Sequence, residues 1–323
     1  IREACCGKQH ADYARTLLVH GQFMQAAGNF SEADQSLQSA IEILRGALGP
    51  ENDEVARAVG SLAALKLEQG DLEEAQRLFQ NALAAAEAVL GAEHADVAQL
   101  VNNLAAVHFQ RGVYAQAEEL FARALAIRQK VLPAAHPSIA QGYNNLAAAC
   151  ARQERFADAS NFYQKALAMR EGALGAEHPH VADTLYSLAL LCLKQRDPSS
   201  AESFLTRALA IYEKTLDANH PSIGNVLQSL GEVRLLQDAS AEAASLFERA
   251  LSIHQAALGA AHPNVGYDLL GLAELHMRRG DNEKADGLLR QAATILENGL
   301  GPAHPDVLGC RAKIDALGQG NSL

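Results

Sequence analysis

The stretch LGAEHPHVA, from Leu174 to Ala182, decides the fold because it recurs along the chain. Segments of the same kind open every 42 residues, without insertion or deletion. Their first residues are Leu48, Leu90, Leu132, Leu174, Leu216, Leu258 and Leu300. A fixed period in this range is the signature of a repeat protein, in which each unit packs on its neighbours.

A histidine occupies the same place in most copies: His10, His94, His136, His178, His220, His262 and His304. Equivalent positions in stacked helical repeats lie at least one helix spacing apart, about 8–10 Å. A shared metal would need imidazole nitrogens about 2 Å from one ion. The column is therefore predicted to be structural and to bind no metal, with each histidine as an N-cap whose ring nitrogen accepts a backbone N–H.

The rest of the segment is typical of a turn between two helices. Glycine after the leucine suits a left-handed residue that ends a helix, and the following proline suits the start of the next one. Copies without proline place an acid near the positive helix end, as at Asp53 and Asp96. His180 occurs in one copy only and falls in the same first turn.

Between the turns, each copy carries two amphipathic helices. In the third copy, apolar residues recur at helical spacing over 97–108, Gly112 interrupts the pattern, and a second helix follows. Glu118 and Glu119 are expected on the wet face of that second helix. The first helices are expected to begin near 13, 55, 97, 139, 181, 223 and 265.

Small residues recur where two helices cross closely. Two alanine columns mark the second helices: Ala33, Ala75, Ala117, Ala159, Ala201, Ala243 and Ala285, then Ala40, Ala82, Ala124, Ala166, Ala208, Ala250 and Ala292. A large column lies between them: Leu37, Phe79, Phe121, Tyr163, Leu205, Phe247 and Leu289. The first helices carry a small column: Gly21, Ala63, Ala105, Ala147, Ala189, Gly231 and Ala273.

These columns resemble the tetratricopeptide repeat, and the 42-residue period with its "NNLA" and "RALAI" motifs is similar to the kinesin light chain type of that repeat. The resemblance covers nearly the whole chain. It implies an all-α fold: an α-solenoid, a right-handed superhelix of seven helix-turn-helix hairpins with a C-terminal capping helix. The expected repeats are 13–54, 55–96, 97–138, 139–180, 181–222, 223–264 and 265–306.

The ends are expected to differ from the repeats. Residues 1–12 align with the end of a preceding repeat's second helix and its turn, so a longer array or a larger protein is expected. The cap is expected over 307–317 and a flexible tail over 318–323.

Composition narrows the possible functions. The net charge of −11 argues against nucleic acid and anionic membranes as partners. No apolar run is long enough to span a bilayer. The five cysteines form no C-x-x-C motif, which favours a reducing, cytoplasmic setting. Cys150 and Cys192 are expected to pack in the core, and Cys5 and Cys6 to face solvent. No catalytic motif occurs, so an enzyme is not expected and no cofactor is implied.

The resemblance implies that the first helices line the inside of the solenoid. Side chains opposite the packed stripe form a predicted peptide-binding groove: Arg57, Gln99, Asn102, Asn103, Gln141, Asn144, Asn145, Arg152, Tyr186, Ser187, Lys194, Asn225, Gln228 and Ser229. Amides donate and accept at once, which suits the backbone of an extended peptide. The second Asn of each pair, Asn103 and Asn145, could equally bond within the scaffold.

Charge adds a weak preference. The bases assigned to this surface are Arg15, Arg57, Arg152, Lys194 and Arg278, and the acids are Glu68, Asp183, Glu232 and Glu274. The surface is near neutral in an acidic chain, which favours an acidic peptide segment. The expected function is an adaptor-like scaffold that binds peptide segments of partner proteins. The alternative is a regulatory or sensor domain of a larger signalling protein, packed on a neighbouring domain. The sequence fixes neither partner nor oligomeric state.

Overall fold

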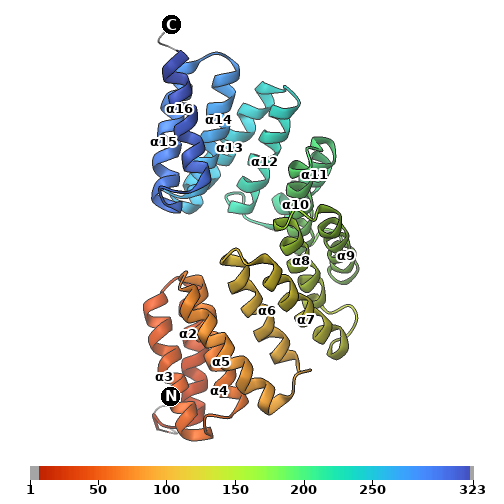
Figure 1. Ribbon diagram of the computed structural model, residues 1–323, viewed down its shortest axis with the longest axis vertical. Coiled ribbons are helices and arrows are strands. Elements are labelled where there is room, and N and C mark those ends of the chain that lie inside the picture. The colour runs from red at the N-terminus through yellow and green to blue at the C-terminus, as the bar shows by residue number, and fades with distance from the viewer. Residues whose placement is uncertain (1–6, 321–323) are drawn as a thin grey trace. The chain divides into compact units, whose positions relative to one another are not determined.

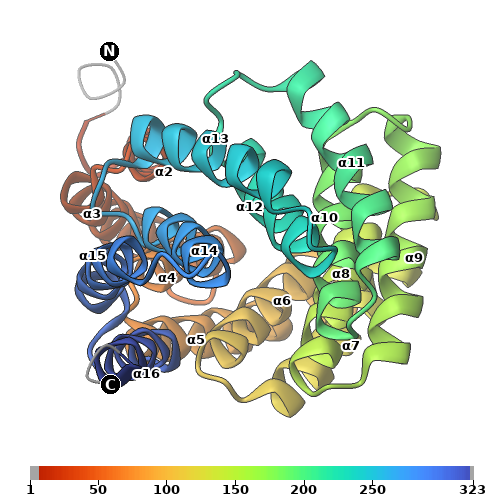
Figure 2. The ribbon, with the colours of Figure 1, turned by 90° about the horizontal axis from the view of Figure 1, so that it is seen from above.

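The computed structural model describes residues 7–320, which form fifteen helices and no strand. The helices pair in chain order as hairpins, followed by the single helix α16 (Figures 1 and 2). The first helices of the hairpins are α2 (Ala11–Ala26), α4 (Asp53–Glu68), α6 (Ala95–Gln110), α8 (Pro137–Arg152), α10 (Pro179–Lys194), α12 (Pro221–Leu236) and α14 (Pro263–Arg278). The second helices are α3 (Phe30–Leu48), α5 (Leu72–Leu90), α7 (Tyr114–Val131), α9 (Phe156–Leu174), α11 (Pro198–Thr215), α13 (Ser240–Leu258) and α15 (Asn282–Leu300). The hairpins fall into two compact units, Ile1–Met169 and Arg170–Leu323, which are treated separately below.

The first helices begin directly after a side-chain cap. At each of the seven column histidines, Nδ1 accepts the backbone N–H two residues on, at 3.1 to 3.3 Å. Asn52 replaces histidine in the remaining copy, and its Oδ1 accepts the Glu54 N–H at 2.9 Å. The predicted capping role of these histidines is confirmed. Because the cap lies immediately before the helix, the first helices begin two residues earlier than expected.

The second helices end on glycine where the sequence provides one. Gly49, Gly91, Gly259 and Gly301 adopt φ of 80 to 92° with ψ of 155 to 160°. Only glycine occupies this region readily. The predicted positive φ is confirmed, although ψ is extended rather than left-handed helical. Where Pro133 or Asp217 stands instead, α7 and α11 end one residue earlier, on an extended leucine.

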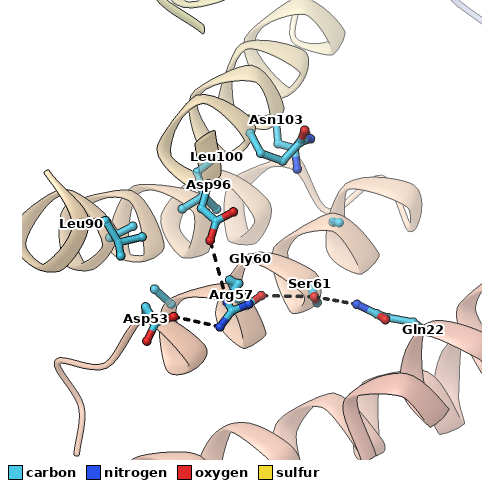
Figure 3. A pocket seen from close by; sticks show the side chains of 13 residues that line it. Gln22, Asp53, Arg57, Gly60, Ser61, Leu90, Asp96, Leu100 and Asn103 are labelled. Atoms are coloured by element: carbon cyan, nitrogen blue, oxygen red, sulfur yellow. Dashed lines mark hydrogen bonds and ion pairs between the residues drawn. The ribbon is translucent and has the colours of Figure 1, made fainter. Parts of the chain in front are cut away.

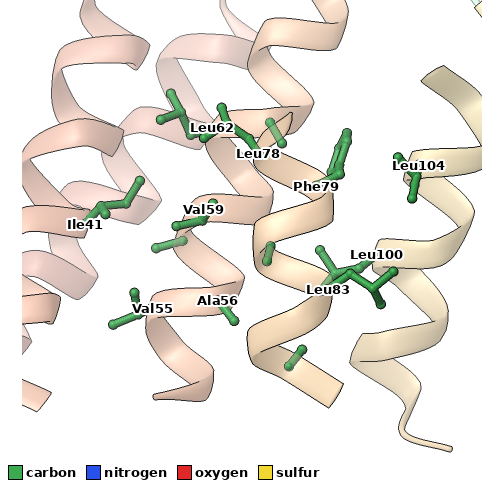
Figure 4. Packing of buried hydrophobic residues seen from close by; sticks show 14 of the residues in the cluster. Ile41, Val55, Ala56, Val59, Leu62, Leu78, Phe79, Leu83, Leu100 and Leu104 are labelled. Carbon is green, nitrogen blue, oxygen red and sulfur yellow. The ribbon is translucent and has the colours of Figure 1, made fainter. Parts of the chain in front are cut away.

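The predicted columns form the core. All fourteen column alanines of the second helices are buried, and so is the large column between them. A Cβ added to Gly21 would lie 2.8 Å from Leu37 Cγ, and one added to Gly231 would lie 2.8 Å from Phe247 Cε1. Figure 4 shows Phe79 of the large column on α5, on the side of that helix that faces Leu104 of α6. The small residues therefore allow the close helix crossing that the sequence predicts.

Two expectations at the C-terminus need correction. Helix α16 spans Pro305–Gly320 and is longer at both ends than the expected 307–317. It starts early because His304 caps it, as in the repeats. Residues 318–320 are helical rather than a tail, while 321–323 lie outside the described residues, as do Cys5 and Cys6. No helix in the described part of the chain is both long and apolar enough to cross a bilayer.

Glu118 also differs from its prediction as an ordinary surface acid. Its carboxylate accepts hydrogen bonds from Arg155 Nη1 at 2.8 Å and from Gln153 Nε2 at 2.7 Å. These bonds outweigh the opposing effect of burial and hold the pKa of Glu118 below its ordinary value. Glu119 is exposed, as expected. One acid of the pair thus ties its hairpin to the next, and the other faces water.

Candidate functional site

All the predicted groove residues lie on first helices, from α4 to α12. We call the sides of α2, α4, α6 and α8 that lie opposite their packed stripes the first-helix surface of the N-terminal unit. Those of α10, α12 and α14 form the corresponding surface of the C-terminal unit.

Several of the predicted amides bond to one another rather than standing free. Asn145 Nδ2 donates to Asn102 Oδ1 at 2.9 Å and joins α8 to α6. Gln99 Nε2 donates to Asn103 Oδ1, and Gln141 Nε2 to Asn145 Oδ1, both at 2.8 Å. These bonds support the scaffold interpretation that the sequence leaves open for Asn103 and Asn145, and Asn102 takes part in the same row of bonds.

A buried arginine on the second helix α7 hydrogen-bonds to the amide side chains of this row. Arg128 on α7 is 3% exposed, donates to Gln99 Oε1 at 2.9 Å and to the Ser138 carbonyl at 3.1 Å, and lies 3.4 Å from Asn102 Oδ1. It thereby joins its own hairpin to the start of α8. The equivalent positions, which we call the strut column, are Leu44, Ala86, Arg128, Arg170, Tyr212, His254 and Leu296. The sequence reasoning missed these residues, although four polar members in an otherwise apolar column were the signal.

In the C-terminal unit, two strut residues bond to α10. Arg170 Nη1 donates to Thr184 Oγ1 at 2.7 Å and to the His180 carbonyl at 2.8 Å. Tyr212 Oη donates to Asp183 Oδ1 at 2.6 Å. Burial and this carboxylate raise the pKa of Tyr212 well above its usual range. Both side chains are held in the scaffold.

The third strut of this unit forms a fully buried polar cluster. His254 Nδ1 lies 2.6 Å from Asp268 Oδ2, and neither side chain is exposed to solvent. His254 Nε2 lies 3.1 Å from Asn225 Oδ1, which also accepts from Asn264 Nδ2 at 2.8 Å. Burial raises the pKa of Asp268. Asn225 is thus a scaffold residue, which narrows the predicted groove.

The other predicted groove residues differ in their solvent exposure and in their hydrogen-bond partners. Arg152 is exposed, with its guanidinium 5.8 Å from the Phe109 ring centroid, and Lys194 is exposed as well. Asn144 Oδ1 is buried and has no hydrogen-bond partner among the described residues. The remaining members bond locally: Tyr186 with Ser229, Ser187 with the Asp183 carbonyl, and Gln228 with Glu232. Ser229 is buried, which leaves it little room to contact a partner.

A pocket of about 300 Å³ opens on the first-helix surface between α4 and α6 (Figure 3). Its floor is apolar: Ala56, Gly60, Ala64, Ala86, Leu90 and Leu100. Its rim is polar: Gln22, Asp53, Arg57, Ser61, Asp96, Gln99 and Asn103. Three predicted groove residues, Arg57, Gln99 and Asn103, are therefore brought together around one hollow. The sequence reasoning missed the floor, because a pocket requires missing side chains on two different helices.

Arg57 dominates the rim. Its Nη2 donates to Asp53 Oδ2 at 2.8 Å, and its Nε lies 3.9 Å from Asp96 Oδ2 (Figure 3). On its other side a shallower hollow between α2 and α4 is lined by Arg15, Leu18, Val19, Gln22, Glu54, Arg57 and Ser61. Two hollows therefore follow each other along the first-helix surface, with Arg57 between them.

Among residues 7–320, no group of three or more His, Cys, Asp or Glu side chains is arranged to hold a metal ion. Burial and the neighbouring Glu118 raise the pKa of the Cys150 thiol to about 11. That thiol is buried in the core as expected, whereas Cys192 is only partly buried.

Comparison with known proteins matches this architecture to one family. The family model described as "Tetratricopeptide repeat" matches residues 12–88, 54–130, 138–214, 201–256 and 222–298. The chain belongs to the tetratricopeptide repeat family. The family covers nearly the whole array, and the predicted kinesin light chain-like repeat is supported by the solved structures below. No curated protein matches the sequence significantly.

Among solved structures, a putative kinesin light chain of Podosopora anserina with nearly identical TPR-like repeats is 26% identical, with a TM-score of 0.54. The match covers 64% of this chain and 97% of that one. The apo form of RapI is 15% identical over 94% of this chain and 99% of its own, with a TM-score of 0.64. The Rap conjugation gene regulator of plasmid pLS20, in complex with the Phr* peptide, is 15% identical over 87% of this chain and 73% of its own, with a TM-score of 0.62. The two Rap likenesses establish the shared tetratricopeptide fold alone.

Proposed function

We propose that this protein is an adaptor-like interaction scaffold that binds an extended peptide segment of a partner protein along its first-helix surface. The observation that carries the proposal is the pair of consecutive hollows on α2, α4 and α6, with an apolar floor and a hydrogen-bonding rim. Ligand sites generally combine an apolar lining with a few placed polar groups. A fold neighbour whose structure was solved in complex with a peptide supports the same use of this architecture. Reduced cysteines favour a cytoplasmic setting.

Further contacts are available on α8. Arg152 offers an exposed guanidinium whose described contact is an aromatic ring rather than a carboxylate. Asn144 is half-buried and its Oδ1 is closed to solvent, so it would bond the peptide backbone through its Nδ2, and Arg152 would pair with an acidic side chain of the peptide. Asn102 and Asn145 would instead hold α6 and α8 together beneath the peptide, while Asn103, which accepts from Gln99 of the same helix, would stay on the rim of the pocket. In the C-terminal unit, Lys194, Gln228 and Tyr186 would serve a peptide bound there.

The test is a binding titration against a partner peptide mapped from a pull-down with the full chain. The double variant Asn144→Ala with Arg152→Glu should weaken binding about tenfold or more, which is about 1.4 kcal/mol. The fold should survive because both side chains lie outside the alanine columns, and circular dichroism checks this. The matched control is Glu119→Lys, an exposed charge reversal on a second helix, which should leave affinity unchanged at moderate salt. Loss of binding in the control but not in the double variant would move the partner to the second-helix side and end this proposal.

A further inference from the structure

We propose that the pocket between α4 and α6 is an anchor site for one aliphatic side chain of the bound peptide, with a lysine or arginine next to it in the peptide. This inference rests on the proposed peptide-binding function and deepens it. It specifies which residue type the array selects and where. The argument has three parts: why the pocket exists, what its floor accepts and what its rim attracts.

The pocket lies where two repeat positions, one in the strut column and one on a first helix, carry unusually small residues. In the strut column, the position below the pocket is Ala86, whereas the next four copies carry Arg128, Arg170, Tyr212 and His254. On α4, the floor is Gly60, whereas the two following copies carry Asn102 and Asn144 there. Both truncations line the same hollow. Where Arg128 is present instead, it reaches the amides of the first-helix surface and fills the equivalent space.

The floor accepts an apolar group. Ala56, Gly60, Ala86, Leu90 and Leu100 surround it with carbon atoms. A Cβ added to Gly60 would lie only 2.8 Å from Leu100 Cδ2, so Leu100 packs directly on the Gly60 backbone and the two residues together form an apolar part of the floor. Figure 4 shows Leu100 next to Leu83 on the α5 side, where it is held by the core. A polar side chain would lose its water here without gaining a partner from the floor, whereas an aliphatic one gains by leaving water.

The rim attracts a cation. Asp53 and Asp96 flank the pocket, and Arg57 is the single described ion-pair partner of both. Arg57 donates to Asp53 at 2.8 Å but stays 3.9 Å from Asp96, so the Asp96 carboxylate is only partly compensated. The adjoining hollow adds Arg15 and Glu54, which bond to each other. The linings of the two hollows therefore carry three carboxylates and two guanidiniums, a net charge of −1.

This local charge separates the pocket from the α8 end of the surface. Near Arg152 an acidic residue of the peptide is favoured, whereas beside Asp96 a lysine or arginine is favoured. Opposite charges arranged in this way across an interface fix the register of the bound segment and suppress wrong partners. The pocket would therefore select peptides in which an aliphatic residue stands next to a lysine or arginine.

The experiment selects ligands without assuming a partner. A phage-displayed library of random dodecapeptides is panned against the full chain, and the recovered peptides are synthesised and titrated. The expected consensus is an aliphatic residue beside a lysine or arginine. Gly60→Leu should reduce the affinity of these peptides about tenfold or more by filling the pocket. Gly46→Leu is the matched control, because Gly46 lies on α3 with no atom within 4 Å of an added Cβ, and it should bind as the wild type does.

Two further variants keep the test decisive. If Gly60→Leu fails to fold, Ala86→Leu fills the pocket from α5 instead of α4, and Leu44 shows that the strut column tolerates leucine. Asp96→Asn should weaken the basic consensus peptides about two- to fivefold, the range of an exposed ion pair, and reduce their salt dependence. Peptides that bind equally well to the pocket-filled variants, or that lack an aliphatic residue, would overturn the anchor-site inference while leaving peptide binding intact. Recovery of no peptide at all would overturn the proposed function together with it.

Discussion

The buried cluster of His254, Asp268 and Asn225 allows a sharp stability prediction. His254→Leu removes the partner of an Asp268 carboxyl group that is 0% exposed. The other oxygen of this carboxyl group, Oδ1, already has no partner among the described residues. Breaking a buried pair by removing one member costs about 3–5 kcal/mol, because the remaining group stays buried without compensation. We therefore expect His254→Leu to destabilise the α12–α14 region by about this amount.

Steric strain would not explain that loss. The repeat supplies a native precedent for leucine at this position, since Leu296 stands in the same column and packs over Gly266. Gly224 is the equivalent glycine beneath His254, where an added Cβ would lie 2.5 Å from Nε2. The backbone around His254 is thus already shaped like the site that holds Leu296.

The double variant His254→Leu with Asp268→Val separates the charge from the packing. Valine is the native residue at the equivalent Val226, which is fully buried. Replacing both members of a buried pair by apolar residues is often neutral or stabilising by about 1–4 kcal/mol. Asn225 keeps its bond from Asn264 in both variants. The double variant should therefore recover most of the stability that the single variant loses.

Urea unfolding followed by circular dichroism gives the midpoints, and amide hydrogen exchange assigns the change to α12, α13 and α14. Exchange is needed because stability in repeat arrays is carried by neighbouring interfaces rather than by one transition. A single variant within about 0.5 kcal/mol of wild type, or a double variant as unstable as the single one, would refute the reasoning.

Two other predictions concern the N-terminal packing and the acid response. Ala124→Leu should lower the free energy of unfolding by about 1–3 kcal/mol, because Ala124 is 1% exposed in a close helix crossing. The control Glu119→Leu changes an exposed residue and should stay within about 0.5 kcal/mol of wild type. Equal urea midpoints for the two variants would show that the helix faces are misassigned. Arg234 and Gln237 donate to Glu202 and lower its pKa from 4.5 to about 2, so its contribution is present above about pH 4.5 and is lost as pH falls toward 2. Since the pair is partly exposed, solvent screening limits this contribution to about 1 kcal/mol, and Glu202→Gln should flatten the stability curve by that amount across this window.

The sequence predicts the helices and their packed faces well, because a strict period shows each position many times. A column that is alanine in every copy, such as Ala82 and Ala124, can be assigned to the core without knowing the fold. Local rules suffice for the ends: His94 caps a helix and Gly91 terminates one, using groups only a few residues away. These features depend on short-range geometry, which the repeat reproduces.

The candidate site was harder to predict, since its contacts cross between repeats. Asn102 and Asn145 were correctly placed on the first-helix surface, but the sequence gives no measure of the 2.9 Å bond between them. Long side chains add to the difficulty. Arg128 belongs to an inward column and yet reaches the amides of the surface, and Glu118 belongs to an outward one and yet bonds Arg155. The helical periodicity of a sequence shows on which face of the helix a side chain is attached. It does not show where the charged end of a long side chain lies.

Departures from the columns, rather than the columns themselves, give each repeat its own chemistry. The backbone of every hairpin is nearly the same, so a repeat can differ from its neighbours only in what a side chain fills or leaves empty. Arg128 and His254 fill the strut position and bond the first helices into the scaffold. Ala86 has no long side chain at that position, Gly60 has none on the facing helix, and both line the pocket. A single small residue would be covered by a neighbouring side chain, whereas two small residues that face each other leave a pocket. Selectivity for peptide side chains is therefore expected where small residues coincide on adjacent helices.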